Sequence, residues 1–154
     1  MARLARVALA DCLDDLAVDG RICVVPLHSG AKTRAAAGQD LVVAVLRQAM
    51  KGLPAPRGQV QIADVLQIRP NRLQQKVLNR QQRAGNVTGN IRASPRTRVQ
   101  GLNAVIFDDV MTSGATLQAA ARAVSARGGL VRAGVVVAYR PWICADLQGR
   151  RVSG

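Results

Sequence analysis

The sequence has few aromatic residues, few cysteines and no long apolar run. Aromatic side chains make up only 2% of the 154 residues, so alanine, valine, leucine and isoleucine must fill the core. Cys12, Cys23 and Cys144 lie far apart without a CxxC pair, and there is one histidine, which argues against a zinc site. No stretch approaches the roughly 18 apolar residues of a membrane-spanning helix. Because aspartates interrupt the first 18 residues, no signal peptide is indicated, and we expect a cytoplasmic protein without a membrane span.

Acidic residues are also scarce in this chain. There are 9 of them against 22 lysines and arginines, which gives a formal net charge of +13. Such a charge favours an anionic partner, such as nucleotide phosphates, a nucleic acid or a membrane surface. An arginine-rich composition with an ordinary basic surface would give the same charge, so the charge does not decide between them. The length and the 49% hydrophobic fraction fit one domain with a single core.

The apolar pattern predicts helices and strands that alternate along the chain. Helical spacing covers Leu4–Leu16, Gln39–Met50 and Thr116–Arg127, and short apolar runs typical of buried strands cover Ile22–Val25, Ala104–Phe107 and Val131–Ala138. A further strand could lie within Gln59–Leu66. Such alternation indicates an α/β fold, a mainly parallel twisted sheet flanked by helices.

Two basic segments interrupt this alternation. Arg69–Arg98 is polar and too long for an ordinary connection, so it contains a helix or forms a functional loop. Trp142–Gly154 has the composition of a basic tail. We therefore expect one domain over residues 1–140 and a basic C-terminal tail over residues 141–154.

The segment between residues 105 and 117 has the residue types that a sugar-phosphate site needs. An apolar strand leads into Asp108 and Asp109, and Thr112–Thr116 follows before a helix. Ligands of parallel α/β sheets bind at the carboxyl ends of the strands. Loop N–H groups and the helix N-terminus favour a phosphate, and Gly114 lets the backbone approach it closely. The two carboxylates suit the hydroxyl groups of a ribose, so we expect phosphate and sugar to bind side by side.

A purely structural interpretation of the same segment is available. Asp109 would then cap the helix and Thr112 would form a turn. This interpretation leaves two carboxylates without partners at the end of a buried strand. Burial of unpaired charges would cost free energy.

The segment resembles the phosphoribosyl pyrophosphate (PRPP) signature of type I phosphoribosyltransferases, in which an apolar strand, two acidic residues and a T-[TS]-G-x-T loop follow one another. More narrowly, the chain resembles the ComF/GntX family, phosphoribosyltransferase-like proteins linked to DNA uptake in competence. Gln75–Gly89 follows that family's Q-x-x-L-x-x-x-x-R-x-x-N-V-x-G spacing, and Val24–His28 resembles its first-strand segment. The CxxC pairs of the family's zinc ribbon are missing, and its R-G-F-N-Q box retains only Gln39.

The resemblance implies a role for individual residues. Asp108 and Asp109 would hold the ribose hydroxyls as the catalytic carboxylates. The 5′-phosphate would be bound by Thr112, Ser113, Gly114, Ala115 and Thr116. The pyrophosphate would face His28, Ser29, Gly30 and Lys32, although a lone histidine is more often structural. A mobile basic loop over the site would contain Lys76, Arg80 and Arg83, unless these residues form a solvated helical face.

The resemblance implies that the domain over residues 1–140 has the type I phosphoribosyltransferase fold. It further implies transfer of phosphoribosyl from PRPP to a nitrogenous acceptor with release of pyrophosphate. Mg²⁺ would enter as its complex with PRPP and not through protein ligands. Tyr139 and Trp142 could stack on a base or merely pack on the sheet. The alternative is a non-catalytic, PRPP-sensing competence protein that binds single-stranded DNA electrostatically, with a competence helicase as partner. A PRPP-sensing transcriptional regulator ranks third because no helix-turn-helix module is visible. We expect a homodimer or a monomer.

Overall fold

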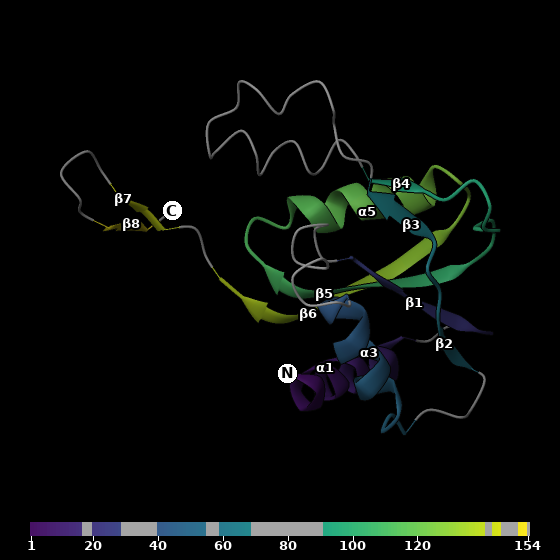
Figure 1. The fold of residues 1–154 in the computed structure, drawn as a ribbon, viewed down its shortest axis with the longest axis horizontal. Helices are drawn as coiled ribbons and strands as arrows, with labels where there is room; N and C mark the ends of the chain where they lie inside the picture. Colours follow the sequence, from purple (N-terminus) through teal and green to yellow (C-terminus); the bar gives the residue numbers. More distant parts are fainter. Residues whose placement is uncertain are drawn as a thin grey trace.

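The computed structural model describes residues 1–16, 20–28, 40–54, 59–68, 91–140, 143–145 and 151–153. Its helices, labelled as in Figure 1, are α1 (Ala2–Asp15), α3 (Leu41–Met50) and α5 (Ala115–Ser125). Its strands are β1 (Ile22–Pro26), β2 (Val60–Ile62), β3 (Leu66–Ile68), β4 (Ile91–Ala93), β5 (Asn103–Met111), β6 (Leu130–Tyr139), β7 (Ile143–Ala145) and β8 (Arg151–Ser153).

A four-stranded parallel sheet in the order β2-β1-β5-β6 forms the centre of the domain. β1 pairs with β2 and β5, and β5 pairs with β6, in each case in parallel. Every residue of β1 is buried, and so is Ala104–Phe107 in β5. Continuous burial of this kind arises because both faces of a parallel sheet are covered. The expected α/β fold, a mainly parallel sheet flanked by helices, is confirmed.

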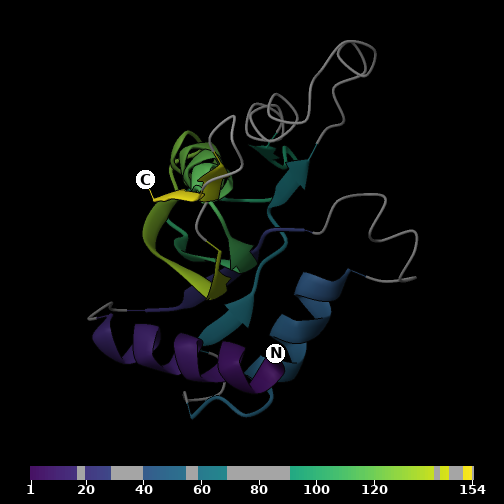
Figure 2. The ribbon, with the colours of Figure 1, turned by 90° about the vertical axis from the view of Figure 1, so that its left-hand side faces the viewer.

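The helices cover opposite faces of the sheet, as Figures 1 and 2 show. On one face, α1 and α3 bury Leu9 and Leu46 together with Phe107 of β5. On the other face, α5 packs Ala120 against Ile106. Side chains alternate between the two faces along a strand, so successive residues of β5 contribute to different halves of the core.

The strand order reverses between β1 and β5. After β1 the chain passes through α3 to β2 on one side, and after β5 it passes through α5 to β6 on the other. Because α3 and α5 cover opposite faces, the chain diverges at this point of the sheet. Such a divergence at the carboxyl ends of adjacent parallel strands is the usual ligand-binding place of open α/β sheets. Pro26 is aligned with Phe107, so His28 and Asp108 both lie just beyond this aligned pair.

The strands differ from the expectation in three places. β5 does not end at Phe107 but continues to Met111, because β6 supplies partners such as Val136 for Asp108. The segment Gln59–Leu66 divides into β2 and the start of β3. β4 lies inside the basic segment and pairs antiparallel with β3, and its three residues are too few to show a period.

The cysteines and the C-terminal segment complete the description. Cys23 is a buried free thiol, and burial raises the pKa of the half-buried Cys12 thiol. β7 and β8 form an antiparallel pair, while the division into a domain and a tail remains a prediction. Among the helices described, none combines the length and apolar character needed to cross a bilayer.

The burial of Phe107 generates a stability prediction. Phe107 has 0% exposure and fills the core half beneath α1 and α3. We expect Phe107→Ala to lower the free energy of unfolding by about 3–5 kcal/mol, through lost burial and the cavity that remains. Urea unfolding followed by circular dichroism measures this. Leu4→Ala on α1, where the side chain is 60% exposed, is the control and should change stability by less than about 0.5 kcal/mol. Similar losses in both variants would contradict the assigned core.

Candidate functional site

The candidate site is built on the last residues of β5 and the loop before α5. Ala104–Phe107 is buried, Asp108 and Asp109 are half-buried, and Thr112 and Ser113 are exposed. The strand therefore emerges from the core at its first carboxylate. The structural interpretation in which Asp109 caps the helix is wrong, since Asp109 lies within β5 and Gly114 is the N-cap of α5.

The loop turns sharply from strand to helix at Gly114. Its φ of 72° and ψ of −2° are left-handed, a conformation that glycine adopts without the strain of a Cβ. The Gly114 carbonyl accepts from the Gln118 N–H at 3.0 Å, and the Ser113 hydroxyl oxygen accepts from the Ala115 N–H at 3.4 Å. The first N–H groups of a helix have no partner within the helix and form the positive end of its dipole. With the Thr112 and Ser113 hydroxyls beside them, they suit an anion such as a phosphate.

Burial changes the acidity of Asp108. Its Oδ1 accepts from the Asp109 N–H at 2.9 Å. Burial raises the pKa of Asp108 to about 6, and the neighbouring charge of Asp109 adds to the rise against the lowering effect of backbone hydrogen bonds. Asp108 is therefore ionised above about pH 6, where it can accept hydrogen bonds from hydroxyl groups.

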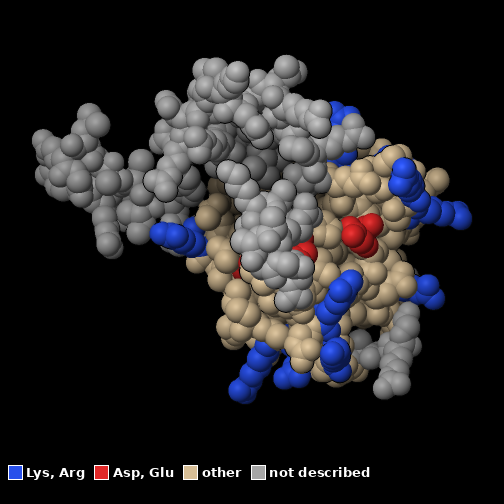
Figure 3. All heavy atoms as spheres, in the orientation of Figure 1, with Lys and Arg blue, Asp and Glu red and all other residues tan. Residues whose placement is uncertain are grey.

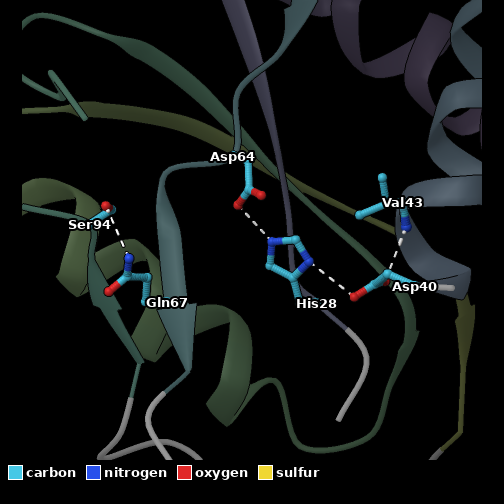
Figure 4. A network of polar contacts seen from close by, with 6 residues as sticks. All are labelled: His28, Asp40, Val43, Asp64, Gln67 and Ser94. Atoms are coloured by element: carbon cyan, nitrogen blue, oxygen red, sulfur yellow. Dashed lines mark hydrogen bonds and ion pairs between the residues drawn. The ribbon is translucent and has the colours of Figure 1, made fainter. Parts of the chain in front are cut away.

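His28 lies two residues beyond Pro26, where β1 ends. Its ring lies between two carboxylates (Figure 4). Its Nδ1 lies 3.0 Å from Asp40 Oδ2, and its Nε2 lies 2.7 Å from Asp64 Oδ1. Asp40 also caps α3, because its Oδ1 accepts from the Val43 N–H at 3.3 Å. A pyrophosphate contact by His28 remains a prediction, and it would require the ring to give up one of these partners.

The remaining predicted residues are placed only in part. Outside the described residues lie Ser29, Gly30, Lys32, Lys76, Arg80, Arg83 and Trp142. Tyr139 is exposed at the end of β6 and is aligned with Met111, beside the loop before α5. Asp40 and Asp64 were not identified as site residues from the sequence. An aspartate directly before an apolar helical pattern is a typical N-cap, which could have drawn attention to Asp40, whereas nothing in the local sequence marks Asp64.

Two hollows in the described part of the chain lie away from this edge. One, of about 270 Å³, lies where the C-terminal end of α1 meets the first residues of β1 and β2. The other, of about 430 Å³, lies between β4 and α5. Among the described residues, no group of three or more His, Cys, Asp or Glu side chains is arranged to hold a metal ion.

Comparison with known proteins finds similarity in structure only. Neither a known protein family nor a curated protein matches the sequence. A hypoxanthine phosphoribosyltransferase from Staphylococcus aureus is 10% identical, with a TM-score of 0.46 over 99% of this chain and 69% of that one. The HGPRT-ase from Leishmania tarentolae in complex with GMP is 19% identical, with a TM-score of 0.43 over 99% of this chain and 68% of that one. Trypanosoma cruzi hypoxanthine phosphoribosyl transferase is 14% identical, with a TM-score of 0.45 over 92% of this chain and 76% of that one.

The raised pKa of Asp108 predicts a specific dependence of stability on pH. The folded-state value of about 6 exceeds the ordinary 3.8, so the folded chain binds this proton more tightly than the unfolded chain. Asp108 therefore lowers stability progressively as the pH rises from about 4 to about 6. Asp108→Asn removes this penalty and keeps an acceptor oxygen for the Asp109 N–H. At pH 7 we expect the variant to be more stable than the wild type by about 1–2 kcal/mol, after allowance for solvent screening.

Urea unfolding at several pH values between 4 and 7 measures the difference between Asp108→Asn and the wild type. The gain should diminish steadily on acidification and be lost near pH 4. A gain that is the same at every pH would show that Asp108 ionisation is not its source.

Proposed function

We propose that this chain binds PRPP at the carboxyl ends of β1 and β5, as a phosphoribosyltransferase-like protein of the ComF/GntX type. One observation carries the proposal. Asp108 and Asp109 lie at the exposed end of a central parallel strand, and the loop Thr112–Gly114 and the N-terminus of α5 follow directly. The site lies where the strand order reverses, the place at which open parallel sheets bind ligands.

The two halves of the site suit the two parts of a ribose phosphate. The carboxylates of Asp108 and Asp109 accept hydrogen bonds from the sugar hydroxyls, as strong charge-assisted bonds. The loop and the first turn of α5 bind the 5′-phosphate through backbone N–H groups and the hydroxyls of Thr112, Ser113 and Thr116. Because Gly114 has no side chain, the phosphate can approach the backbone there.

Catalysis, where an acceptor is present, would depend on position and charge. The bond from ribose C1 to pyrophosphate breaks while a bond from C1 to the acceptor nitrogen forms, and that nitrogen loses its proton. No protein nucleophile is needed, so the chain contributes by holding the ribose in place and by stabilising the departing anion. Mg²⁺ would shield the charge of PRPP and take its ligands mainly from PRPP oxygens and water, with Asp108 and Asp109 as the nearby carboxylates.

The carboxylates give the direct test of PRPP binding. We expect Asp108→Asn with Asp109→Asn to weaken PRPP binding about 100-fold or more, the equivalent of two charge-assisted hydrogen bonds at about 1.5 kcal/mol each. Calorimetric titration of PRPP with Mg²⁺ measures the affinity. A matched control removes the same charge from exposed positions on α1, with Asp11→Asn and Asp15→Asn. Unchanged PRPP affinity in the β5 variant would refute the site. Pyrophosphate release, measured across a panel of bases and amines, decides whether turnover occurs.

The hollow between β4 and α5, called the groove from here on, favours the alternative function, a non-catalytic PRPP-sensing protein that binds single-stranded DNA. Alanines form the floor of the groove, and the exposed Arg92, Arg122 and Arg127 lie along its border. Among described residues the ion pairs are those of His28, so these guanidinium groups have no carboxylate partner there. On the face shown in Figure 3, acidic side chains lie near the middle, and most of the visible lysine and arginine side chains lie toward the edges. Arginines without a carboxylate partner among the described residues suit phosphodiesters, and the small number of aromatic residues in the chain favours mainly electrostatic binding.

The groove predicts how DNA affinity depends on salt. Arg92→Gln with Arg122→Gln should weaken single-stranded DNA binding and lower the slope of log affinity against log salt by about 1.4, for two lost phosphate contacts. Fluorescence anisotropy of a labelled oligonucleotide at several salt concentrations measures both. The control is Arg3→Gln with Arg132→Gln, two exposed arginines outside the groove. No detectable binding by the wild type at low salt would exclude this function.

A further inference from the structure

β6 forms one edge of the central sheet. It pairs with β5 on its inner side, and among the strands that the structure describes none pairs with its outer side. With 10 residues it is longer than a typical strand of about five or six. An edge strand presents a row of N–H and C=O groups that can pair with another chain. β6 is therefore a template to which a further strand can be added.

β6 has little of what normally protects such an edge. Proteins usually blunt edge strands with charged side chains, prolines or β-bulges. The one charged residue of β6, Arg132, lies at the register shift in the pairing with β5, and its Nε donates to Asn103 Oδ1 of the same sheet at 3.0 Å. Both protective features thus lie near the start of the strand. The rest of β6, Ala133–Tyr139, contains no charge and no proline.

The sequence of β6 is compatible with antiparallel pairing to a second copy of itself. A two-fold axis at Val136 aligns Ala133–Tyr139 with the same residues of the copy, so that Val135 lies opposite Val137. Apolar cross-strand pairs stabilise an antiparallel sheet, whereas like charges directly opposite each other destabilise it. Because this segment has no charged residue, no like charges meet in this register. The same surface would serve both copies, as in other two-fold interfaces.

α1 lies on one face of the sheet, beneath β6 (Figure 1). Ala5 and Leu9 of α1 belong to the same core cluster as Val135 of β6, whereas α3 contacts β1 and β5. A two-fold axis perpendicular to the sheet keeps the α1 of each copy on the same face and reverses its direction. The two α1 helices would therefore lie antiparallel beneath the joined strands.

The charges of α1 suit an antiparallel copy better than they suit a single helix. Its basic residues lie near its start and are Arg3 and Arg6. Its acidic residues lie toward its end and are Asp11, Asp14 and Asp15. The helix dipole favours the reverse arrangement. Among the described residues the ion pairs are those of His28, so the charges of α1 have no ion-pair partner there. An antiparallel copy brings the basic start of one helix toward the acidic end of the other.

We infer that this chain forms a two-fold symmetric dimer in which β6 pairs antiparallel with β6 of a second copy, with the two α1 helices beneath the joined strands. The central sheet would then have eight strands, four from each copy. Because the strands of the two copies run in opposite directions, the two candidate PRPP sites open at opposite ends of this sheet. The dimer itself depends on neither PRPP nor DNA.

The strand pairing predicts that a charge at Val136 disrupts the dimer. In Val136→Lys two lysines face each other across the axis, so the dissociation constant of the dimer should rise about tenfold or more. Sedimentation equilibrium over a range of protein concentrations measures this constant, and the wild type should approach twice the chain mass. The control is Gln48→Lys, which adds the same charge at an exposed position of α3 and should leave dimerisation unchanged.

Charge reversal on α1 tests the helix contact with exposed side chains, and it decides the matter if Val136→Lys does not fold. Arg3→Glu gives α1 an acidic start, and Asp11→Lys with Asp15→Lys gives it a basic end. Each variant alone should dimerise about tenfold less tightly, because like charges meet at both ends of the helix pair. An equal mixture of the two should form a mixed dimer with nearly wild-type affinity, since opposite charges then meet at both ends.

Three results would overturn the inference. The first is a wild type that remains a monomer at every concentration. The second is a dimer as tight in folded Val136→Lys as in the wild type. The third is a mixture of the α1 variants that associates no better than each variant alone. Thermal unfolding shows which variants are folded. None of these results bears on the proposed PRPP site, which the calorimetric titration tests separately.

Discussion

The parallel pairing of β1 with β5 is the constraint on which the rest of the structure depends. Both strands are covered on both faces, so a charged or polar side chain is costly in either strand until the strand extends beyond the core. In β5 this point is Asp108, and beyond β1 it is His28, each just past the aligned pair of Pro26 and Phe107. Because α3 and α5 leave these strands toward opposite faces, neither helix lies between the two polar ends. One register therefore sets both the dry core and the place where a ligand can meet charged groups.

The few carboxylates of this chain gather where that constraint allows them. Four of its 9 acidic residues lie at the carboxyl edge of the sheet, Asp40 and Asp64 around His28, and Asp108 and Asp109 at the end of β5. Asp40 and Asp64 contact the ring of His28, and Asp108 accepts from the backbone N–H of Asp109. The arrangement favours a ligand that has both hydroxyl groups and phosphates.

Much of this fold could be predicted from the sequence, because its strongest signals are local. The helical spacing of Leu4–Leu16 and Gln39–Met50 and the apolar run Ile22–Val25 correspond to α1, α3 and β1. The end of β5 was placed too early, because its last residues are held by pairing with β6 and not by an apolar pattern of their own. Asp40 and Asp64 lie 12 and 36 residues from His28, and no local pattern reveals a contact over such distances.

The raised pKa of Asp108 links the candidate site to the solvent. A carboxyl group that titrates near pH 6 holds a proton for part of the time in mildly acidic solution. A hydroxyl-bearing ligand that needs the ionised form displaces that proton, so occupation of the site and proton release are coupled. The heat of binding then includes the ionisation heat of whichever buffer takes up the proton, and it changes from one buffer to another even when the contacts with the ligand are the same.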